Sequence, residues 1–239
     1  MPVLLSSILV KFYMENLPIQ SYADFAFGST HQQFALKALS GHYTELSEKK
    51  RTWELRALER VKSQLDTHCL QLVEHFVTSG KGTAGFHLCL VTDLLGETTS
   101  LSSPTAKRIL RHVLRALASM HERGMIHTDL KSDHVFFENI LTSTEIEHTL
   151  SENPPKRHEA EASWDGAVQA AVSQPLPMPA LHDFATRRLV LGDMGSAQPI
   201  DSEQRTTSII TPPALRAPEI FLHGPWDEKV DIWSFGCLI

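Results

Sequence analysis

The central stretch of the chain, from Ser103 to Gly124, is the feature that most constrains the fold, because it carries an apolar stripe at helical spacing. Ser103 and Pro104 suit the N-cap and the first helical position, and the stripe ends at Gly124. The apolar residues of the stripe are Ile109, Leu110, Val113, Leu114 and Leu117. We therefore expect a long amphipathic helix here, which excludes a fold made of strands alone.

The residues ahead of this helix favour strands. Phe34–Leu39 (FALKAL) is a short apolar run, and Leu70–Val77 and Phe86–Asp93 are two more, separated by the glycine-rich turn SGKGTAG. Between the first and second runs, Thr52–Leu65 has apolar residues at helical spacing. The first part of the chain is thus predicted to be mostly sheet with one helix, and the fold class is α+β.

The segment Asn139–Arg187 has no sustained period and is rich in Pro, Ser and charge. We interpret it as an inserted, largely flexible loop. A strand is predicted at Leu189–Leu191, and the ends of the insert lie close together if this strand is adjacent to Phe136–Phe137. A final helix is predicted to begin near Asp231.

Charge and cysteine content limit the classes of partner. The 239 residues include 28 acidic and 22 basic side chains, a net charge of −6, which argues against nonspecific binding of nucleic acid and is compatible with a basic partner. Cys69, Cys89 and Cys237 are widely spaced and odd in number, so we expect a reducing compartment, the cytoplasm and nucleus. The apolar stretch Pro2–Val10 is too short to span a bilayer, and no membrane anchor is predicted.

Six motifs follow one another in a fixed order. They are Ala35-Leu36-Lys37, Glu54, His127-Thr128-Asp129-Leu130-Lys131, Asp193-Met194-Gly195, Ala217-Pro218-Glu219 and Asp231-Ile232-Trp233. This ordered set resembles the signature of protein kinases. The segments GHYTE, HLCLVTDLLG, HTD in place of HRD, LRAPEIFL and WDEKVDIWSFGC are similar to the SR-protein-specific Ser/Thr kinases and their fungal relatives.

The resemblance implies a protein-kinase-like two-lobe fold that is incomplete. We expect an atypical N-terminal segment at 1–33, a small, mainly β N-lobe with its hinge at 34–95, and a truncated, mainly helical C-lobe at 96–239 that contains the insert at 139–187.

The resemblance also implies a site that uses ATP and Mg2+. Asp129 would accept or orient the proton of the substrate hydroxyl, Lys131 would neutralise the transferred phosphoryl group, and Asp193 would hold Mg2+. Lys37 would contact the α and β phosphates, and Glu54 would pair with it. The alternative is a surface Lys and a solvated Glu, but FALK places the Lys between apolar neighbours, where an unpaired ammonium is costly.

The resemblance assigns the adenine contacts mainly to the backbone. The carbonyl of Asp93 and the N–H of Leu95 would bind the base, Ala35 would form its apolar roof, and Thr92 would lie at the back of the pocket.

Other members of the motifs are expected to be structural. His127 is interpreted as a packed residue, Asp231 as a brace for the backbone of the loop at 127–131, and Glu219 as an anchor of the activation segment. Thr128 replaces the Arg with which many kinases sense a phosphorylated activation segment, so constitutive activity is expected.

Three departures from the pattern bear on activity. The glycine-rich phosphate loop is not recognisable, because Gly28 is the only glycine between Phe12 and Phe34. His134 occupies the place of an Asn that binds a second Mg2+, and imidazole is a poor ligand for this ion, so His134 is either a packed neutral residue or a doubtful metal ligand.

The third departure is the end of the chain in its final helix. It would leave a large apolar patch exposed, which we expect to recruit a chaperone or a second copy of the chain. The residues of this expected patch are Ile232, Trp233, Phe235, Leu238 and Ile239.

Two functions remain open from the sequence. The first is a Ser/Thr kinase that transfers the γ-phosphate of ATP to Arg/Ser-rich protein substrates, which an acidic chain suits. The second is a pseudokinase or interaction module that keeps the fold with little or no catalysis, favoured by His134 and the missing glycine-rich loop.

Overall fold

The computed structural model describes residues 34–62, 68–80, 85–97, 103–138, 141–154, 156, 158–159, 161–163, 166–168, 187–202 and 211–238. The N-terminal segment, on which the expectation about the glycine-rich loop depends, lies outside these residues. The chain divides into two compact units, one of 1–44, 73–96 and 139–177, the other of 45–72, 97–138 and 178–239.

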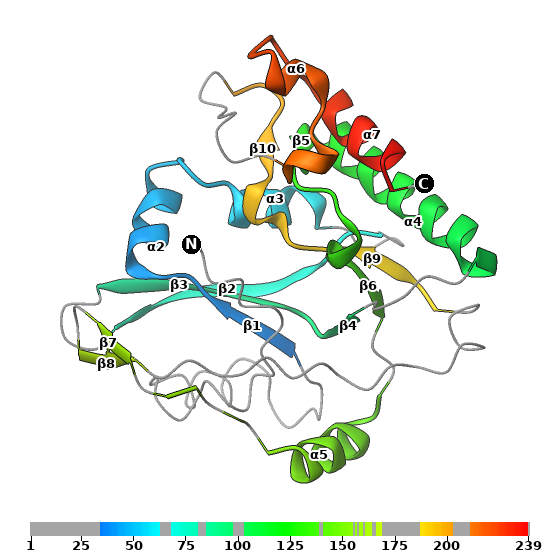
Figure 1. Ribbon diagram of the computed structural model, residues 1–239. Coiled ribbons are helices and arrows are strands. Elements are labelled where there is room, and N and C mark those ends of the chain that lie inside the picture. The colour runs from blue at the N-terminus through cyan, green and yellow to red at the C-terminus, as the bar shows by residue number, and fades with distance from the viewer. Residues whose placement is uncertain are drawn as a thin grey trace. The chain divides into compact units, whose positions relative to one another are not determined.

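The first unit is built on a three-stranded sheet in the order β1-β3-β2 (Figure 1), in which β1 and β3 are antiparallel. Its strands are β1 (Phe34–Ala38), β2 (Leu72–Ser79) and β3 (Phe86–Asp93), all three within the ranges that the apolar runs predict or close to them. Leu36 pairs with Val91 across β1 and β3, and both are buried in one cluster with Cys89. The alternation of a strand places this cluster on one face of β1 and leaves Ala35 and Lys37 on the other.

Helix α2 (Gly41–Glu48) was not predicted from the sequence. The side chain of Ser40 accepts a hydrogen bond from the backbone N–H of Tyr43, and Thr44 is the only buried residue of the helix. The hydroxyl of Thr44 accepts a 2.8 Å hydrogen bond from the N–H of Leu88 at the β3 strand. A short helix with one buried residue has no apolar stripe for periodicity to detect.

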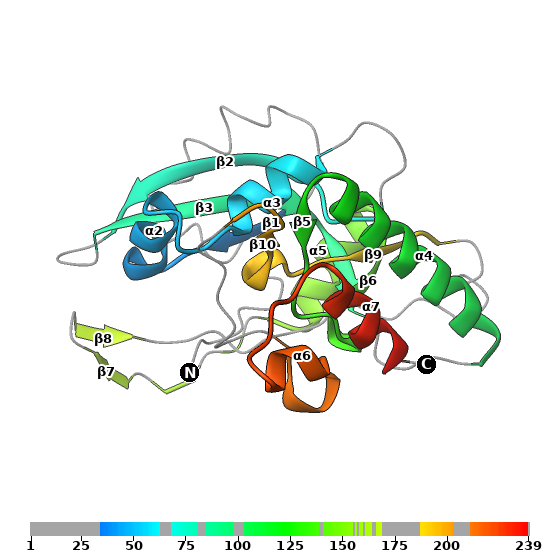
Figure 2. The ribbon, with the colours of Figure 1, turned by 90° about the horizontal axis from the view of Figure 1, so that it is seen from above.

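The second unit contains the predicted central helix, α4 (Ser103–Glu122), which packs against β5 (Met125–Ile126) and β9 (Leu189–Leu191) (Figure 2). Gly124 follows the helix with φ +72°, a backbone conformation that glycine adopts without steric cost. The predicted first helix is α3 (Glu54–Val61), which buries Ala57, Leu58 and Val61.

The predicted pairing of the strands on either side of the insert is confirmed. β6 (Val135–Glu138) and β9 are antiparallel, with Phe136 opposite Val190 and Phe137 opposite Leu189. A second short pair joins β10 (Gln198–Pro199) to β5. A further strand, β4 (Leu95–Glu97), lies between β3 and α4 in the sequence.

The insert contains regular structure that the sequence analysis did not predict. Helix α5 covers Ser143–Glu152, and β7 (Glu161–Ser163) forms an antiparallel pair with β8 (Gly166–Val168). The helix starts at a capping box, in which Thr142 and Glu145 exchange side-chain and backbone hydrogen bonds. The capping box stabilises the start of this helix although the segment has no regular spacing of apolar residues. The flexibility of the insert stays a prediction.

The last part of the second unit comprises α6 (Pro218–Phe221) and α7 (Lys229–Gly236). Ala217, Ile220 and Val230 form a buried cluster with Ile126. The expected apolar patch at the end of the chain is only partly present. Ile232 and Trp233 are 48% and 47% exposed, Leu238 is half-buried, and Ile239 lies outside the described residues. The predicted exposure of Phe235 is wrong, since it is 8% exposed. A helix presents different residues to opposite sides, so adjacent apolar residues differ in burial. No helix in the described residues is long and apolar enough to cross a membrane.

Candidate active site

The predicted brace of the loop that carries HTDLK is present in the second unit. Both carboxylate oxygens of Asp231, which is 1% exposed, accept backbone hydrogen bonds: Oδ2 from the N–H of His127 and Oδ1 from the N–H of Thr128, each at 2.8 Å. Oδ2 is also 2.8 Å from Nε2 of His121 on α4. One carboxylate on α7 therefore holds the start of the loop against the central helix.

His127 is fully buried and has a structural role in the site. The N–H of Asp129 donates to Nδ1 of His127 at 3.3 Å, so Nδ1 carries no proton and Nε2 donates to the carbonyl of Gly192 at 2.9 Å. Burial is the largest influence on the pKa of His127; it lowers this pKa and so favours the neutral ring. The neutral imidazole thus links the loop to the residue before Asp193, as the sequence analysis expected of a packed residue.

The two expected catalytic side chains lie together. Nζ of Lys131 is 3.4 Å from Oδ2 of Asp129, and their side chains are 21% and 19% exposed. The ammonium thus lies beside the carboxylate, and both side chains are partly accessible. This arrangement can accept a proton from a hydroxyl and stabilise negative charge on a neighbouring group.

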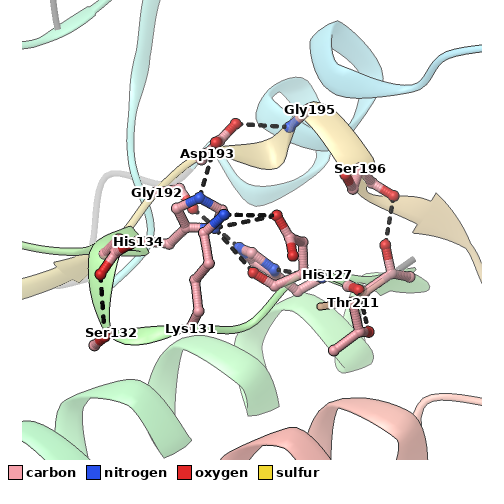
Figure 3. A network of polar contacts seen from close by, with 12 residues as sticks. His127, Lys131, Ser132, His134, Gly192, Asp193, Gly195, Ser196 and Thr211 are labelled. Atoms are coloured by element: carbon pink, nitrogen blue, oxygen red, sulfur yellow. Dashed lines mark hydrogen bonds and ion pairs between the residues drawn. The ribbon is translucent and has the colours of Figure 1, made fainter. Parts of the chain in front are cut away.

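His134 lies beside Asp193 (Figure 3) and also contacts Asp129. Its Nδ1 is 2.9 Å from the backbone carbonyl of Asp129, and its Nε2 is 3.0 Å from Oδ2 of Asp193. Its backbone carbonyl accepts a hydrogen bond from Gly192, which precedes Asp193. The His134 side chain is 4% exposed, so the ring is a packed part of the site as well as a neighbour of both carboxylates.

Asp193 adopts a left-handed backbone conformation, with φ +53°. Its Oδ1 accepts a hydrogen bond from the N–H of Gly195 at 3.3 Å, at the start of the 3₁₀ turn Met194–Ser196. A non-glycine residue at positive φ is uncommon and marks a strained turn, here one that directs the carboxylate towards His134.

Gly192 explains how the chain approaches β6 so closely before this turn. A Cβ at Gly192 would lie 2.8 Å from Cε2 of Phe136, inside the distance that real side chains keep. A side chain there would separate Phe136 from the segment that carries Asp193.

Thr128 ties the loop to both sides of the segment that follows Asp193. Its hydroxyl donates to the carbonyl of Ser196 at 2.6 Å, and its own carbonyl accepts from the hydroxyl of Thr211 at 2.6 Å. Thr128 is 1% exposed with φ +65°. The absence of an Arg at this position is evident from the sequence, whereas the contacts of Ser196 and Thr211 are not, because no motif marks these two residues.

The residues expected to hold the nucleotide base belong to the first unit. Ala35 pairs with Thr92, and Lys37 with Leu90, across β1 and β3, so these four share the face of the sheet opposite the Leu36 cluster. Asp93 ends β3 and is half-buried, whereas Leu95 begins β4 and is buried. The two backbone groups expected to bind the base, the carbonyl of Asp93 and the N–H of Leu95, therefore lie where β3 ends and β4 begins.

Glu54 begins α3 in the second unit and is 8% exposed. The alternative of a solvated helix Glu is therefore wrong, because the side chain is buried. Helix α3 contacts the 3₁₀ turn that follows Asp193. Glu54 therefore belongs to a helix that packs against the segment after Asp193.

The fit of a divalent cation can be judged from the donors present. Asp193 offers a carboxylate of the kind Mg2+ prefers, whereas His134 offers a nitrogen that suits this ion poorly. No group of three or more His, Cys, Asp and Glu side chains arranged for a metal occurs among the residues described. A cation here would need oxygen ligands from a bound molecule or water in addition to protein side chains.

The family is decided by the chain-wide match: the protein kinase domain matches residues 26–239. The chain belongs to the protein kinase family. The kinase-like α+β fold expected from the motifs is confirmed by a solved kinase-domain crystal structure that superimposes with a TM-score of 0.58 at 18% identity, over 88% of this chain and 56% of that one.

Curated kinases are similar over most of this chain. A serine/threonine protein kinase of Aspergillus fumigatus is 31% identical over 234 residues, covering 87% of this kinase chain and 50% of the relative. The serine/threonine-protein kinase SRPK of Physarum polycephalum is 23% identical, covering 87% and 53%. The dual specificity protein kinase CLK2 of Homo sapiens is 25% identical, covering 78% and 33%. The chain therefore spans between a third and about half the length of these relatives.

Proposed function

We propose that the chain is the phosphotransferase part of a Ser/Thr protein kinase. The observation that carries this proposal is the arrangement of Asp129, Lys131 and Asp193, which two buried groups, Asp231 and His127, hold in one unit. Phosphoryl transfer requires mainly positioning and charge neutralisation. A carboxylate next to an ammonium, together with a second carboxylate for a cation, supplies both.

In this function, the side chains have separate tasks. Asp129 accepts the proton of the substrate hydroxyl as the oxygen attacks, and Lys131 stabilises the negative charge of the transferred group. Asp193 would hold the divalent cation, which supplies charge neutralisation at the phosphates when bound. Lys37, with its alkyl chain on the strand face next to Ala35, would neutralise the α and β phosphates of ATP.

The proposed substrates are basic proteins rich in Arg and Ser. The support is the net charge of −6 and the similarity to a relative named SRPK. The proposed cosubstrate is ATP, and the proposed location is the cytoplasm and nucleus, in keeping with the three unpaired cysteines in the chain.

The test is phosphate transfer from ATP to an Arg-Ser repeat peptide, measured beside calorimetric binding of ATP with a divalent cation. Asp129→Asn should keep nucleotide affinity within about threefold and lose at least a hundredfold in turnover, since general-base catalysis contributes about 10²–10⁴-fold. Lys37→Met should weaken nucleotide binding. Asp133→Asn is the matched control, because Asp133 is exposed in the same loop and its carboxylate accepts only from Ser132 among the contacts described.

The second candidate is a pseudokinase that binds the nucleotide without transfer. His134, placed against both carboxylates, favours it. This candidate would be supported, and the kinase rejected, if nucleotide binding depends on Lys37 while no phosphate is transferred to any peptide and Asp129→Asn leaves the nucleotide affinity unchanged. No nucleotide binding at all would reject both.

A further inference from the structure

The exposed side of helix α4 carries a row of positive charges. Lys107, Arg111 and Arg115 are exposed and follow one another at intervals of four residues, so they lie in line along the helix surface. Each interval corresponds to about 6 Å along the helix axis. Arg108 differs, because it is half-buried and its guanidinium donates to the backbone carbonyl of Arg187 at 2.8 Å. We call the three exposed side chains the cationic ridge.

The cationic ridge has no acidic partner in the part of the chain that the structure describes. None of its three side chains forms an ion pair there, and Glu122, at the end of α4, is the only acidic residue of the helix. Like charges four residues apart repel one another, and cations near the beginning of a helix oppose its dipole. The ridge therefore lowers the stability of α4. Proteins break such local rules mainly at functional sites.

The positive field of the ridge also acts inside the second unit. The pKa of His112 is lowered mainly by burial and by the neighbouring His68, and then further by Arg108, Arg115 and Arg111. No carboxylate among the described residues offsets these arginines at His112. The charges of the ridge are thus left for a partner outside the described residues to neutralise.

Apolar side chains border the ridge on one side. Leu114 is 42% exposed and lies one helical turn after Arg111. Leu110 is half-buried and precedes Leu114 by four residues, so the two leucines lie in a second row beside the charges. A ligand that covers this side of α4 meets cations and an apolar side chain together.

This combination favours an acidic peptide over nucleic acid. A phosphate backbone offers no apolar group to Leu114, and α4 contains no Phe, Tyr or Trp on which an unpaired base could stack. In an extended peptide, alternate side chains lie on the same face about 6.6–6.8 Å apart. This spacing is close to the interval of about 6 Å between the cations.

We propose that the cationic ridge of α4 is a docking surface for an extended acidic segment of a partner protein. Asp or Glu side chains at alternate positions of the segment contact Lys107, Arg111 and Arg115, and an apolar side chain of the segment packs on Leu114. None of these residues belongs to the side chains assigned to phosphate transfer, so the proposal does not depend on the proposed function. The surface repels basic segments, so it selects a partner other than the proposed Arg/Ser-rich substrates.

The experiment measures the binding of a fluorescent peptide to the 239-residue chain by anisotropy. The probe is an extended peptide with Glu at alternate positions and one central Leu. We expect the parent to bind it, with an affinity that falls about fivefold or more between about 50 and 200 mM salt, because salt screens exposed charges. Arg111→Glu should weaken binding about tenfold or more, and Arg111→Gln should weaken it less.

The same charge reversal should not destabilise the fold. The carboxylate introduced by Arg111→Glu is four residues from both Lys107 and Arg115, so two repulsive pairs become attractive. The melting temperature should therefore equal or exceed that of the parent. Arg51→Glu is the matched control, because Arg51 is exposed outside α4 and the net charge changes by the same amount. It should keep the affinity within about twofold.

Two further probes test the chemistry of the partner. Leu114→Ser should weaken binding of the leucine probe about threefold or more and leave unchanged the binding of a probe with Ser in place of the central Leu. An oligouridine should bind more weakly than the peptide. Tighter binding of the oligouridine, lost in Arg111→Glu, would assign the ridge to nucleic acid and overturn the proposal.

The remaining outcomes also decide the proposal. It would be overturned if the parent does not bind the peptide at low salt. It would be overturned as well if Arg111→Glu and Arg51→Glu weaken binding equally, since net charge alone would then account for it. Phosphate transfer to an Arg-Ser repeat peptide is measured separately and should be the same in the parent and Arg111→Glu, so failure of the docking surface and failure of the kinase are distinguishable.

Discussion

The carboxylate of Asp231 on α7 lies 2.8 Å from the backbone nitrogen of His127, so residues 104 positions apart in the chain meet at the start of the loop that carries the site. The same carboxylate binds the next backbone N–H, that of Thr128. A buried anion is retained only where donors satisfy it, and here the donors belong to the backbone that must be held.

Removal of this carboxylate should destabilise the second unit. Asp231→Ala leaves two buried backbone N–H groups without a partner, and each costs about 1–3 kcal/mol. We expect a loss of about 3 kcal/mol in the free energy of unfolding, measured by urea denaturation. Asp231→Asn, which keeps one acceptor oxygen, should lose less, and the exposed Asp133→Ala should be nearly neutral. Equal stabilities for Asp231→Ala and Asp133→Ala would contradict this role.

The hydroxyl of Thr128 should stabilise the segment after Asp193. Thr128→Val keeps the shape and the branching that the positive φ must accommodate, but leaves the carbonyl of Ser196 without its 2.6 Å donor. The expected cost is about 1–3 kcal/mol. Thr128→Ser keeps the hydroxyl and should cost less than half as much.

Thermal melting of the two Thr128 variants checks this, with faster proteolysis between Ser196 and Thr211 in the Val variant as a second readout. If the Ser variant is the less stable of the two, then the methyl group and not the hydroxyl stabilises this position.

Periodicity predicted the elements that bury an apolar face and failed for those that do not. The stripe from Ile109 to Leu117 marked α4 because one side of that helix packs against two strands. Helix α2 buries only Thr44, and α5 depends on a capping box, so neither has a stripe. The capping box of α5 could have been read from Thr142 and Glu145.

The site was predicted to the extent that its residues lie in motifs. The bond from Asp231 to the loop backbone follows from the motif order, and it is present. The contacts of Thr128 with Ser196 and Thr211 join residues more than 60 positions apart by hydroxyls and carbonyls, which any Ser or Thr could supply. Such contacts depend on tertiary position and leave no pattern in the sequence.

A methyl group at Gly192 should displace the segment that carries Asp193. In Gly192→Ala the new Cβ would be 2.8 Å from the ring of Phe136, so the ring or the backbone must move. We expect a loss of about 1–3 kcal/mol, as for other overpacked positions, and weaker binding of divalent cations. Gly236→Ala is the control: nothing lies within 4 Å of its Cβ, and the residue ends α7, so stability should stay equal or rise.

The stability of the second unit should also depend on His112. This residue of α4 is 8% exposed, and its ring stacks on that of His68 with centroids 4.1 Å apart. Nδ1 of His112 accepts a hydrogen bond from the backbone N–H of Leu189 in β9, so a proton on Nδ1 would break a contact between the helix and the strand.

Burial, with a smaller contribution from His68 and nearby arginines, lowers the pKa of His112 from 6.5 to about 4. Above pH 6.5 neither the folded nor the unfolded state binds this proton, so the stability is fully present. Below pH 6.5 the unfolded state takes up the proton first, and the stability falls by at most about 1.4 kcal/mol per pH unit per histidine until the pH nears 4. Burial lowers the pKa of His127 as well, which adds a loss of the same sign.

His112→Asn keeps an acceptor for Leu189 and removes one titrating group, so its urea midpoints between pH 7 and 4.5 should fall less steeply than those of the parent. The control is His223→Asn, an exposed position, whose urea midpoint should change with pH as steeply as that of the parent. If the stability of the parent stays constant or increases as the pH falls from 6.5 to 4.5, then the burial of neutral His112 does not determine stability.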